Sequence, residues 1–439
     1  MKKVISLLIS ALLLVVLFAC GSNEPEPVAP TPEATPTETA PAQDGDATED
    51  SSAVSADRPF EGTVVTVFLR MRTESCGIDD LIELVREETG IELRVDPSPT
   101  NYADFVTRIT ALLASDDDTY DLIHLDEILL GGFKNIGFLA PVTDVMAPVA
   151  HHYPEAIIET ISRGDSGELY SMPVDLNMMY FYYYAPLFEQ HGLTPPTNRA
   201  EFLEVAKALT DGDVFGYGAA WSRGGFLYND IIRWVYKFDG DYLNWEHPNT
   251  REALQFMYDL IHVYGVAPEA VLAETYDSKN QRILDGLYGM VFQWANLAQA
   301  SGDRFGDDIR IAPMPMFTTN HTIGAGWHIT VNAFSNNIDA AKEVLRIWSS
   351  EAGQMLMLRY EGASFDTVLA SPEALELNPW GRYLSAYVEA GYPVPRLALN
   401  RVPEIQEVME TFASSFFTGQ MTLDEAASGA TAQIQLLLD

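Results

Sequence analysis

The segment Thr63-Val-Val-Thr-Val-Phe-Leu69 opens the folded part of the chain with β-branched and apolar residues, which predict a β-strand. Apolar residues at helical spacing follow at 78–88 and again at 102–114, and each helix pattern leads into a further strand pattern, at 91–95 and 120–125. A strand–helix–strand–helix–strand order requires right-handed crossovers, so the sequence predicts a parallel sheet and an α/β fold. Ligands of such sheets bind beyond the carboxyl ends of the strands, and we therefore expect the loops after these strands to share one rim.

Helix and strand patterns continue through the rest of the chain without an internal repeat. Apolar spacing predicts further helices at 201–209, 251–264, 339–349, 404–417 and 423–438. Short apolar runs predict strands at 214–221, 289–294 and 327–333. The 439 residues suffice for two or three folded units, and the 47% of hydrophobic residues suffice to build their cores.

Acidic residues dominate the charge of the chain. There are 63 Asp and Glu against 26 Lys and Arg, which gives a formal net charge of −37. Proteins that bind nucleic acids need clustered Lys and Arg to displace counterions from phosphates, so this balance argues against a nucleic-acid partner. It favours neutral or cationic ligands at long range, but salt screens charges beyond about 8 Å, so the charges that line a site matter more.

The sequence contains none of the common catalytic or cofactor motifs. It has no Gly-x-x-x-x-Gly-Lys-Ser/Thr phosphate loop and no His-Glu-x-x-His zinc motif, and Asp211-Gly-Asp213 fails the calcium-loop pattern. Its two cysteines, Cys20 and Cys76, cannot build a disulfide framework. Gly164-Asp-Ser-Gly167 resembles part of a serine-protease motif, but the α/β pattern contradicts that all-β fold, and a turn is the simpler interpretation. We therefore expect a protein that is not an enzyme and that binds no metal or cofactor.

The first 20 residues are predicted to be a lipoprotein signal peptide. Lys2 and Lys3 precede sixteen uncharged residues at 4–19, a stretch shorter than the roughly 20 residues that span a bilayer. Its end, Leu17-Phe-Ala-Cys-Gly21, resembles the lipobox of bacterial lipoproteins, in which Cys20 would become the mature N-terminus and carry diacylglycerol. The alternative is an ordinary signal peptide that happens to end in cysteine. Since two or more acyl chains anchor a protein stably, we expect it on the outer face of the cell membrane, at the cell surface or in the periplasm.

Residues 21–58 are predicted to be a disordered stalk. Positions 21–57 contain six prolines and nine acidic residues but no Lys, Arg or aromatic residue. Such a segment cannot bury enough apolar surface to offset the entropy of ordering it. The folded part would therefore be joined to the lipid anchor by an acidic linker rich in Pro and Thr.

Five strings of residues occur in a set order along the chain. They are Asp121-Leu-Ile-His-Leu-Asp126-Glu127, Gly137-Phe-Leu-Ala-Pro-Val-Thr-Asp144, Gly167-Glu-Leu-Tyr-Ser-Met-Pro173, Tyr182-Tyr-Tyr-Ala-Pro-Leu-Phe-Glu-Gln-His-Gly192-Leu-Thr-Pro-Pro196-Thr197 and Gly324-Ala-Gly-Trp-His-Ile329. In this order they resemble the extracellular solute-binding proteins of ABC importers, in the maltose-binding-protein-like, sugar-directed group. The resemblance covers roughly residues 62–439, and Ala185, Pro186 and Asn198 depart from the family pattern.

The resemblance implies a two-lobed periplasmic-binding-protein type II fold with a hinge between the lobes. A ligand would be enclosed when both lobes close on it. The implied boundaries are residues 59–178 and 330–360 for lobe 1, and residues 179–329 and 361–439 for lobe 2. The implied partners are a small-molecule ligand and the transmembrane permease subunits of an ABC importer, and we expect the receptor itself to be a monomer.

The main ligand-binding candidates are acidic, amide and Trp residues, because sugar hydroxyls need paired donors and acceptors while the C–H face of a sugar packs on an aromatic ring. Asp126 and Glu127 follow the third strand directly, although Asp126 would also serve as a helix cap. Trp294 falls where the family often carries a stacking aromatic, and Asn296 is close to it. The glycines before Trp327 permit close approach of a ligand to the backbone, although a buried Trp more often belongs to a core.

Weaker candidates lie on other segments. Arg70, after the first strand, could donate to a ligand or be a surface ion-pair partner. Tyr180 and Tyr182 belong to an aromatic strand whose alternate members face opposite sides, so most of that strand should pack between the lobes. The last candidates flank the glycine pair at 224–225: Trp221, Tyr228 and Asp230.

Three functions are compatible with the sequence. The first is a lipid-anchored receptor that captures a carbohydrate, expected to be an oligosaccharide, and delivers it to a membrane permease. The second is the same receptor fold with a polyamine or another cationic metabolite as ligand, which the net acidity suggests. The third is a secreted glycan hydrolase, which requires two carboxylates at a separation that only a structure gives.

Overall fold

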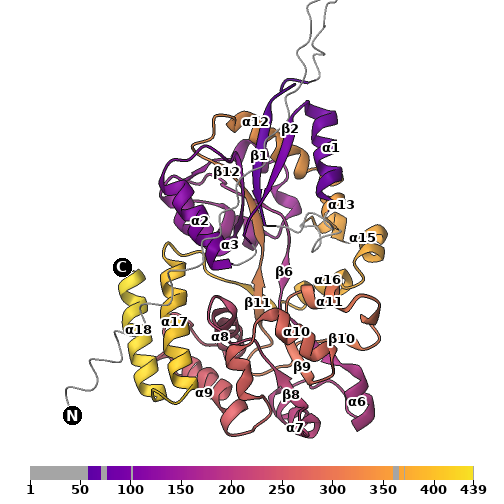
Figure 1. The fold of residues 1–439 in the computed structure, drawn as a ribbon, viewed down its shortest axis with the longest axis vertical. Coiled ribbons are helices and arrows are strands. Elements are labelled where there is room, and N and C mark those ends of the chain that lie inside the picture. The colour runs from indigo at the N-terminus through magenta and orange to yellow at the C-terminus, as the bar shows by residue number, and fades with distance from the viewer. Residues whose placement is uncertain (1–57, 71–76, 100–101, 359–364, 370, 439) are drawn as a thin grey trace, which may run out of the picture. The chain divides into compact units, whose positions relative to one another are not determined.

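The structure, a computed structural model, describes residues 58–70, 77–99, 102–358, 365–369 and 371–438. The predicted signal peptide with Cys20, and the whole predicted stalk except Arg58, lie outside the described residues. Figure 1 shows two groups of strands and helices in the described part, with β6 and β11 running between them. None of the described helices is long and apolar enough to cross a membrane.

The first sheet has six strands. Its order is β2 (Glu92–Pro97), β1 (Val64–Leu69), β3 (Leu122–Asp126), β12 (Trp327–Asn332) and β4 (Leu139–Ala140), with β5 (Met172–Pro173) paired to β12. β1 pairs in parallel with both of its neighbours, and β12 runs antiparallel to β3. With α1 (Ile78–Thr89) and α2 (Tyr102–Ala114) between the strands, the predicted strand–helix–strand–helix–strand unit is confirmed.

Further helices surround this sheet and form the first lobe with it. They are α3 (Glu127–Asn135), α4 (Thr143–Met146), α5 (Glu155–Ile157), α12 (Ile338–Trp348), α13 (Glu351–Met357), α14 (Asp366–Leu369) and α15 (Pro372–Leu377), with a 3-10 turn at Ala150–His152 and a π-helical segment at Ile158–Ser162. α1 packs against α12 and α13, and Leu81, Val344 and Trp348 are fully buried in one core cluster with the strand residue Val65.

The second sheet has four strands and forms the centre of the second lobe. Its order is β10 (Ile309–Ala312), β7 (Tyr180–Tyr184), β9 (Tyr288–Gln293) and β8 (Phe215–Gly218). The helices of this lobe are α6 (Ala185–His191), α7 (Arg199–Leu209), α8 (Phe226–Lys237), α9 (Pro248–His262), α10 (Tyr276–Leu284), α11 (Asn296–Ser301), α16 (Gly381–Glu389), α17 (Val402–Phe417) and α18 (Leu423–Leu438), with 3-10 turns at Glu269–Ala273 and Gly302–Arg304. α17 packs on α8 and α9, so the C-terminal helices belong to this lobe.

A third, three-stranded sheet lies between the other two, and we call it the linking sheet. β11 (Thr322–Ala325) is its central strand, with β6 (Asn177–Met178) antiparallel on one side and β13 (Pro393–Pro395) parallel on the other. β6 leads directly into β7 of the second sheet, and β11 leads into β12 of the first sheet. These strands therefore carry the chain between the lobes.

The strand pairing moves two of the predicted lobe boundaries. All of β12 pairs within the first sheet, so the return to the first lobe occurs in β11 and not at residues 329–330. The run 322–332 carries neither proline nor formal charge, so nothing local marks where it leaves the linking sheet. Phe365 and Ala374 pack in the same core cluster as Val65, so the predicted boundary at residues 360–361 placed them in the wrong lobe.

The strand β3 shows how the fold brings polar residues to one rim. All five of its residues, Leu-Ile-His-Leu-Asp, are buried, as expected of a central strand with covered faces. Its last residue, Asp126, is also the N-cap of α3, because its side chain accepts a hydrogen bond from the Ile128 backbone N–H. Asp126 pairs with Trp327 in the neighbouring strand, so the end of β3 and the start of β12 reach the same edge of the sheet.

Candidate functional site

A cavity of about 450 Å³ lies at this edge of the first sheet. Its first-lobe wall includes residues from the ends of β1 and β3, from the start of β12 and from α2. Its second-lobe wall includes residues from α8, α10 and α11 and from the loop that precedes α8. The expectation of a shared rim is confirmed for β1 and β3, because Arg70 follows β1, Asp126 ends β3, and both line the cavity. The described residues at the end of β2 and after it, 97–99, do not line it.

Six of the eleven predicted ligand-binding residues line the cavity: Arg70, Asp126, Tyr228, Trp294, Asn296 and Trp327. The other five do not reach its wall: Glu127, Tyr180, Tyr182, Trp221 and Asp230. The structure therefore brings the two main Trp candidates and the Asp candidate together from segments that are far apart in the sequence.

The five predicted residues that are absent from the wall lie in the core behind it. Tyr180 and Tyr182 are buried in β7, and the Tyr182 hydroxyl donates to the backbone oxygen of Trp294 at 3.2 Å. Trp221 Nε1 donates to Asp230 Oδ2 at 2.7 Å, and Asp230 Oδ1 accepts from Arg233 Nε at 2.9 Å. Tyr180 and Tyr182 share one face of β7 and Phe181 lies on the other, and all three residues are buried. Both faces of this strand are therefore covered, and neither tyrosine reaches the ligand space.

Asp126 combines the two roles that the sequence offered as alternatives. Its Oδ1 accepts the capping N–H of Ile128 at 3.3 Å, and its Oδ2 accepts the hydroxyl of Tyr102 at 3.2 Å. At the same time its side chain lines the cavity. The helix cap therefore fixes the direction of a carboxylate that is available to a ligand.

Trp327 lies in an aromatic cluster on the first-lobe wall. Its ring centroid is 4.9 Å from that of His124 and 6.4 Å from that of Tyr102, which it meets edge-on. The Arg70 guanidinium carbon lies 5.4 Å from the centre of the Trp327 ring, and Arg70 Nη1 donates to the Pro99 carbonyl at 2.9 Å. The cluster presents a rigid aromatic surface of the type that packs on a sugar ring.

Gly326, before Trp327, is required by packing and also lines the cavity. A Cβ added at Gly326 would lie 2.7 Å from the carbonyl oxygen of Asp175. The side chain of Asp175 accepts the Trp327 backbone N–H at 2.6 Å, so the two backbone segments approach closely. The glycine thus permits the close packing that holds Trp327 in place, and the predicted approach of a ligand to its backbone stays a prediction.

His124 is a wall residue that the sequence analysis missed. Its Nδ1 accepts the Arg70 backbone N–H at 3.3 Å, so the proton of the neutral ring lies on Nε2. Burial, together with the charge of Arg70, lowers the pKa of His124 to about 3, which keeps the ring neutral at ordinary pH. Nε2 has no hydrogen-bond partner among the described residues. His124 therefore adds an unsatisfied donor to the wall.

A glycine loop and α8 form part of the second-lobe wall. Gly224 and Gly225 both have φ of +102°, a conformation that only glycine adopts readily. Glu410, in α17, accepts the backbone N–H groups of Gly224 and Gly225 at 2.8 Å and that of Tyr228 at 3.2 Å. This carboxylate satisfies the first N–H groups of α8 and so fixes the loop beside the cavity.

The rest of the second-lobe wall carries amide and aromatic groups. Trp294 is half-buried, and Asn296 Oδ1 is buried without a hydrogen-bond partner among the described residues. Asn229 Nδ2 donates to the Tyr276 hydroxyl at 3.1 Å. Asn177, in β6, accepts the backbone N–H of Ala295 at 3.3 Å. This wall thus offers polar groups beside the Trp294 ring.

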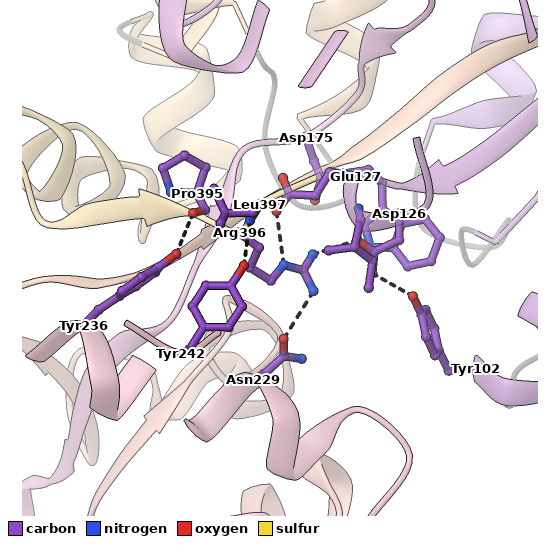
Figure 2. Close-up of polar contacts among 12 residues, drawn as sticks. Tyr102, Asp126, Glu127, Asp175, Asn229, Tyr236, Tyr242, Pro395, Arg396 and Leu397 are labelled. Atoms are coloured by element: carbon purple, nitrogen blue, oxygen red, sulfur yellow. Dashed lines mark hydrogen bonds and ion pairs between the residues drawn. The ribbon is translucent and has the colours of Figure 1, made fainter. Parts of the chain in front are cut away.

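Arg396 is another wall residue that the sequence analysis missed, and Figure 2 shows its contacts. Its Nη2 donates to Asp126 Oδ1 at 2.6 Å and its Nε donates to Glu127 Oε1 at 3.1 Å. Its Nη1 donates to Asn229 Oδ1 at 3.2 Å. No local motif predicts the role of Arg396, because its partners lie 167 to 270 positions away in the chain.

Glu127 lies directly behind the wall and is fully buried. Burial raises the pKa of Glu127 to about 7, although the charge of Arg396 opposes this increase. Glu127 Oε2 has no hydrogen-bond partner among the described residues. The carboxyl group is therefore protonated in a large part of the molecules near neutral pH.

The wall as a whole suits recognition of a polar, uncharged molecule. Its aromatic rings, amides and imidazole N–H are groups that bind hydroxyls and C–H faces. Its charged side chains, which are Arg70, Asp126, Arg223, Asp277 and Arg396, also donate to or accept from hydroxyls. Within the described residues, no group of three or more His, Cys, Asp or Glu side chains is placed to hold a metal ion.

Comparison with known proteins identifies the family. A sequence profile described as bacterial extracellular solute-binding protein matches residues 78–355, more than half of the chain. This chain belongs to that family. Among solved structures, maltose-bound MalE3 of T. maritima is similar with a TM-score of 0.75 and 20% identity, and the match covers 86% of this chain and 100% of that protein.

Two further structures show the same fold. A solute-binding protein of Agrobacterium radiobacter in complex with ribitol has a TM-score of 0.73 at 19% identity, with 87% of this chain and 100% of that chain covered. The maltotriose-binding protein of Thermus thermophilus, bound with maltotriose, has a TM-score of 0.70 at 16% identity, with 85% and 100% covered. The predicted family and the two-lobed α/β fold are thus confirmed for this solute-binding protein.

The ring of Trp294 provides a direct test of the cavity. We expect Trp294→Ala to weaken ligand binding by more than tenfold, about 1.4 kcal/mol, because it removes a half-buried ring from the wall. The melting temperature of the Trp294→Ala variant should stay close to that of the parent protein. Isothermal titration calorimetry and differential scanning calorimetry measure the two effects.

Trp221→Phe is the matched control for Trp294→Ala. It removes a buried core hydrogen bond to Asp230 away from the wall, so it should lower the melting temperature while affinity stays within twofold of the parent. Equal affinity of Trp294→Ala and the parent protein would remove Trp294 from the site.

The raised pKa of Glu127 makes a prediction about stability and pH. A group whose pKa is higher in the folded than in the unfolded state stabilises the fold below its unfolded pKa, here 4.5, and this contribution is lost as pH rises through about 7. Relative to Glu127→Gln, the parent should therefore lose about 3 kcal/mol of unfolding free energy between pH 4.5 and 8. Urea unfolding of both proteins across this range measures the difference, and a difference that does not change with pH would contradict the prediction.

Proposed function

We propose that this solute-binding protein is the receptor of an ABC importer for a neutral carbohydrate, a sugar or a polyol. The observation that carries the proposal is the wall of the cavity, where the rings of Trp294 and Trp327 lie with Asp126, Asn296 and Asn229. Aromatic faces pack on the C–H surfaces of sugars, and carboxylates and amides pair with hydroxyls. Similar structures with bound maltose, ribitol and maltotriose support this class of ligand.

The volume of the cavity favours a small carbohydrate. About 450 Å³ lies in the lower half of the range of roughly 300–1,000 Å³ that small-molecule sites occupy. We therefore propose a ligand of one or two sugar rings, which is a monosaccharide or the shortest of the oligosaccharides that the sequence suggested. Micromolar capture corresponds to about −8 kcal/mol, which two ring stackings and several paired hydroxyls supply after the cost of ordering the site.

The charges on the wall argue against a polyamine. Among the described residues, Asp126 and Asp277 are the acidic residues that line the cavity, and Arg70, Arg223 and Arg396 also line it. The Asp126 carboxylate is already paired with Arg396 at 2.6 Å. A polyamine would enter a cavity with more cationic than anionic side chains, in spite of the net charge of −37 of the whole chain.

The mechanism needs no covalent step. Residues of both lobes line one cavity, so a ligand that contacts both walls stabilises the arrangement in which the lobes are closed on it. The closed receptor would then deliver its ligand to a membrane permease. We propose that it acts as a monomer and does not convert its ligand.

We propose that the receptor is anchored outside the cell through a lipid on Cys20. The support is the uncharged stretch at 4–19, the lipobox-like end of that stretch, and the acidic segment at 21–57. A lipid anchor keeps the receptor close to its permease.

A thermal-shift screen tests the proposed ligand class. The mature protein is heated with maltose, tagatose, galactose, mannitol and ribitol, and separately with putrescine and spermidine. We expect at least one sugar or polyol to raise the melting temperature, with no new products on chromatography of the mixture. Stabilisation only by the amines would establish the polyamine alternative, and release of smaller sugars from a glycan would establish the hydrolase.

Replacement of Cys20 tests the anchor. Cys20→Ser should move the protein from the membrane fraction to the soluble fraction when it is expressed in a bacterium with lipoprotein processing, because the serine hydroxyl does not receive the diacylglycerol thioether. Immunoblots of the two fractions measure the change. If Cys20→Ser stayed with the membrane to the same extent as the parent, the lipid assignment would be wrong.

A further inference from the structure

Arg396 joins the two lobes at the cavity through its backbone and its side chain. Its backbone belongs to the second lobe, because the residues on both sides of it are held by tyrosines there. Tyr236 Oη donates to the Pro395 carbonyl at 2.9 Å, and the Leu397 N–H donates to Tyr242 Oη at 3.1 Å, as Figure 2 shows. Both tyrosines are at the end of α8 or just after it.

The side chain of Arg396 extends from this position to the first lobe. It binds Asp126 at 2.6 Å and Glu127 at 3.1 Å, at the junction of β3 and α3. It also reaches back to Asn229 of α8 at 3.2 Å. Only 4% of Arg396 is exposed, so these contacts are shielded from solvent and from salt.

The chain after Arg396 packs closely on the same helix of the first lobe. A Cβ added at Gly131 of α3 would lie 2.4 Å from the Ala398 carbonyl oxygen, and one at Gly132 would lie 3.0 Å from the Asn400 carbonyl oxygen. Asn135 Nδ2 donates to Asn400 Oδ1 at 2.9 Å. The segment 396–400 thus contacts α3 directly, while its preceding strand β13 pairs with β11 in the linking sheet.

These contacts determine the position of Asp126. Its two carboxylate oxygens are held by Arg396 from the second lobe and by Ile128 and Tyr102 from the first. Arg396 also supplies the positive charge opposite two neighbouring buried carboxyl groups, which would otherwise lack a cation within bonding distance among the described residues. The orientation of Asp126 therefore depends on the second lobe being in place.

We propose that Arg396 is a positioning residue that holds Asp126 toward the ligand and fastens the closed arrangement of the lobes. Ligand capture and lobe closure are then coupled through one side chain. The proposal rests on the proposed function for its affinity measurement, but its effect on lobe closure is independent of the ligand. Glu127, bound by the same guanidinium, strengthens the fastening without touching the ligand.

The test compares Arg396→Met with Arg396→Lys. The probe is whichever of maltose, tagatose, galactose, mannitol and ribitol stabilises the parent most. Arg396→Met should lose at least tenfold in affinity, mainly through faster dissociation in stopped-flow experiments, and its ligand-free radius of gyration in small-angle X-ray scattering should exceed that of the parent. Arg396→Lys should recover part of both effects, because it restores the charge but not the forked geometry.

Arg401→Met is the matched control for these variants. Arg401 lies in the same segment, but its side chain is half exposed and pairs only with Glu404 on the surface in the described part of the chain. We expect its affinity and its scattering profile to equal those of the parent.

A double-mutant cycle with Asp126→Asn tests whether Arg396 acts through Asp126. If it does, the double variant should lose no more affinity than the weaker-binding of the two single variants, whereas independent residues would multiply their losses. Multiplied losses would overturn the positioning role, and so would parent-like affinity and scattering in a folded Arg396→Met.

The measurements separate this inference from the proposed function. If no sugar or polyol bound the parent, the proposed function would fail, while a larger ligand-free radius for Arg396→Met would still support the fastening of the lobes. If Arg396→Met did not fold, as judged by circular dichroism, Arg396→Lys and Arg396→Gln would provide the same comparison.

Discussion

Backbone pairing in the linking sheet is the constraint on which the arrangement of this protein depends. β11 pairs with β6 and β13, and Gly324 lies opposite Met178 on one side and Pro395 on the other. Because these strands are bonded to one another, residues from three distant parts of the chain reach the cavity together. Asn177 begins the first passage between the lobes, Ala325 ends the return, and Arg396 directly follows β13. Main-chain hydrogen bonds of the linking sheet thus fix the positions of these three residues at the cavity.

The net charge of the whole chain does not describe the charges that line the cavity. The chain carries a net charge of −37, yet three arginines and two aspartates line the cavity. Exposed charges interact weakly across more than about 8 Å of salt solution, whereas the buried contact of Arg396 with Asp126 is shielded from that screening. Net acidity therefore describes the chain as a whole and not the charges that line the cavity.

Several buried polar atoms around the cavity have no partner within the described residues. They are His124 Nε2, Tyr228 Oη and Asn296 Oδ1, and their residues come from both lobes. A buried polar group without a partner costs about 1–3 kcal/mol, and native proteins keep few of them. Their concentration around one cavity is the pattern of a site whose hydrogen bonds are completed by a ligand or by water.

Local sequence determined which helices and strands begin the fold, and it indicated that polar residues lie at the carboxyl ends of the first strands. Alternating strand and helix patterns predicted the parallel unit from β1 to β3, because apolar periodicity is a local property of a segment. The same reasoning placed Asp126 after a buried strand, where it both caps α3 and lines the cavity. Ordered motifs identified the family, since such strings reflect recurring turns and strand ends.

Only the tertiary structure decided which of these residues meet. Arg396 and His124 have no local signature, because their role comes from neighbours far away in the sequence: Arg396 is paired with carboxylates about 270 positions earlier, and the tautomer of His124 is set by the backbone of Arg70. Tyr182 and Trp221 were equally plausible by residue type, but both are buried behind the wall. Tyr182 lies in the buried part of strand β7, and Trp221 packs on Phe417 with its Nε1 bonded to Asp230. Residue type fixes the chemistry that a side chain can perform, and long-range packing fixes which side chains face the same space.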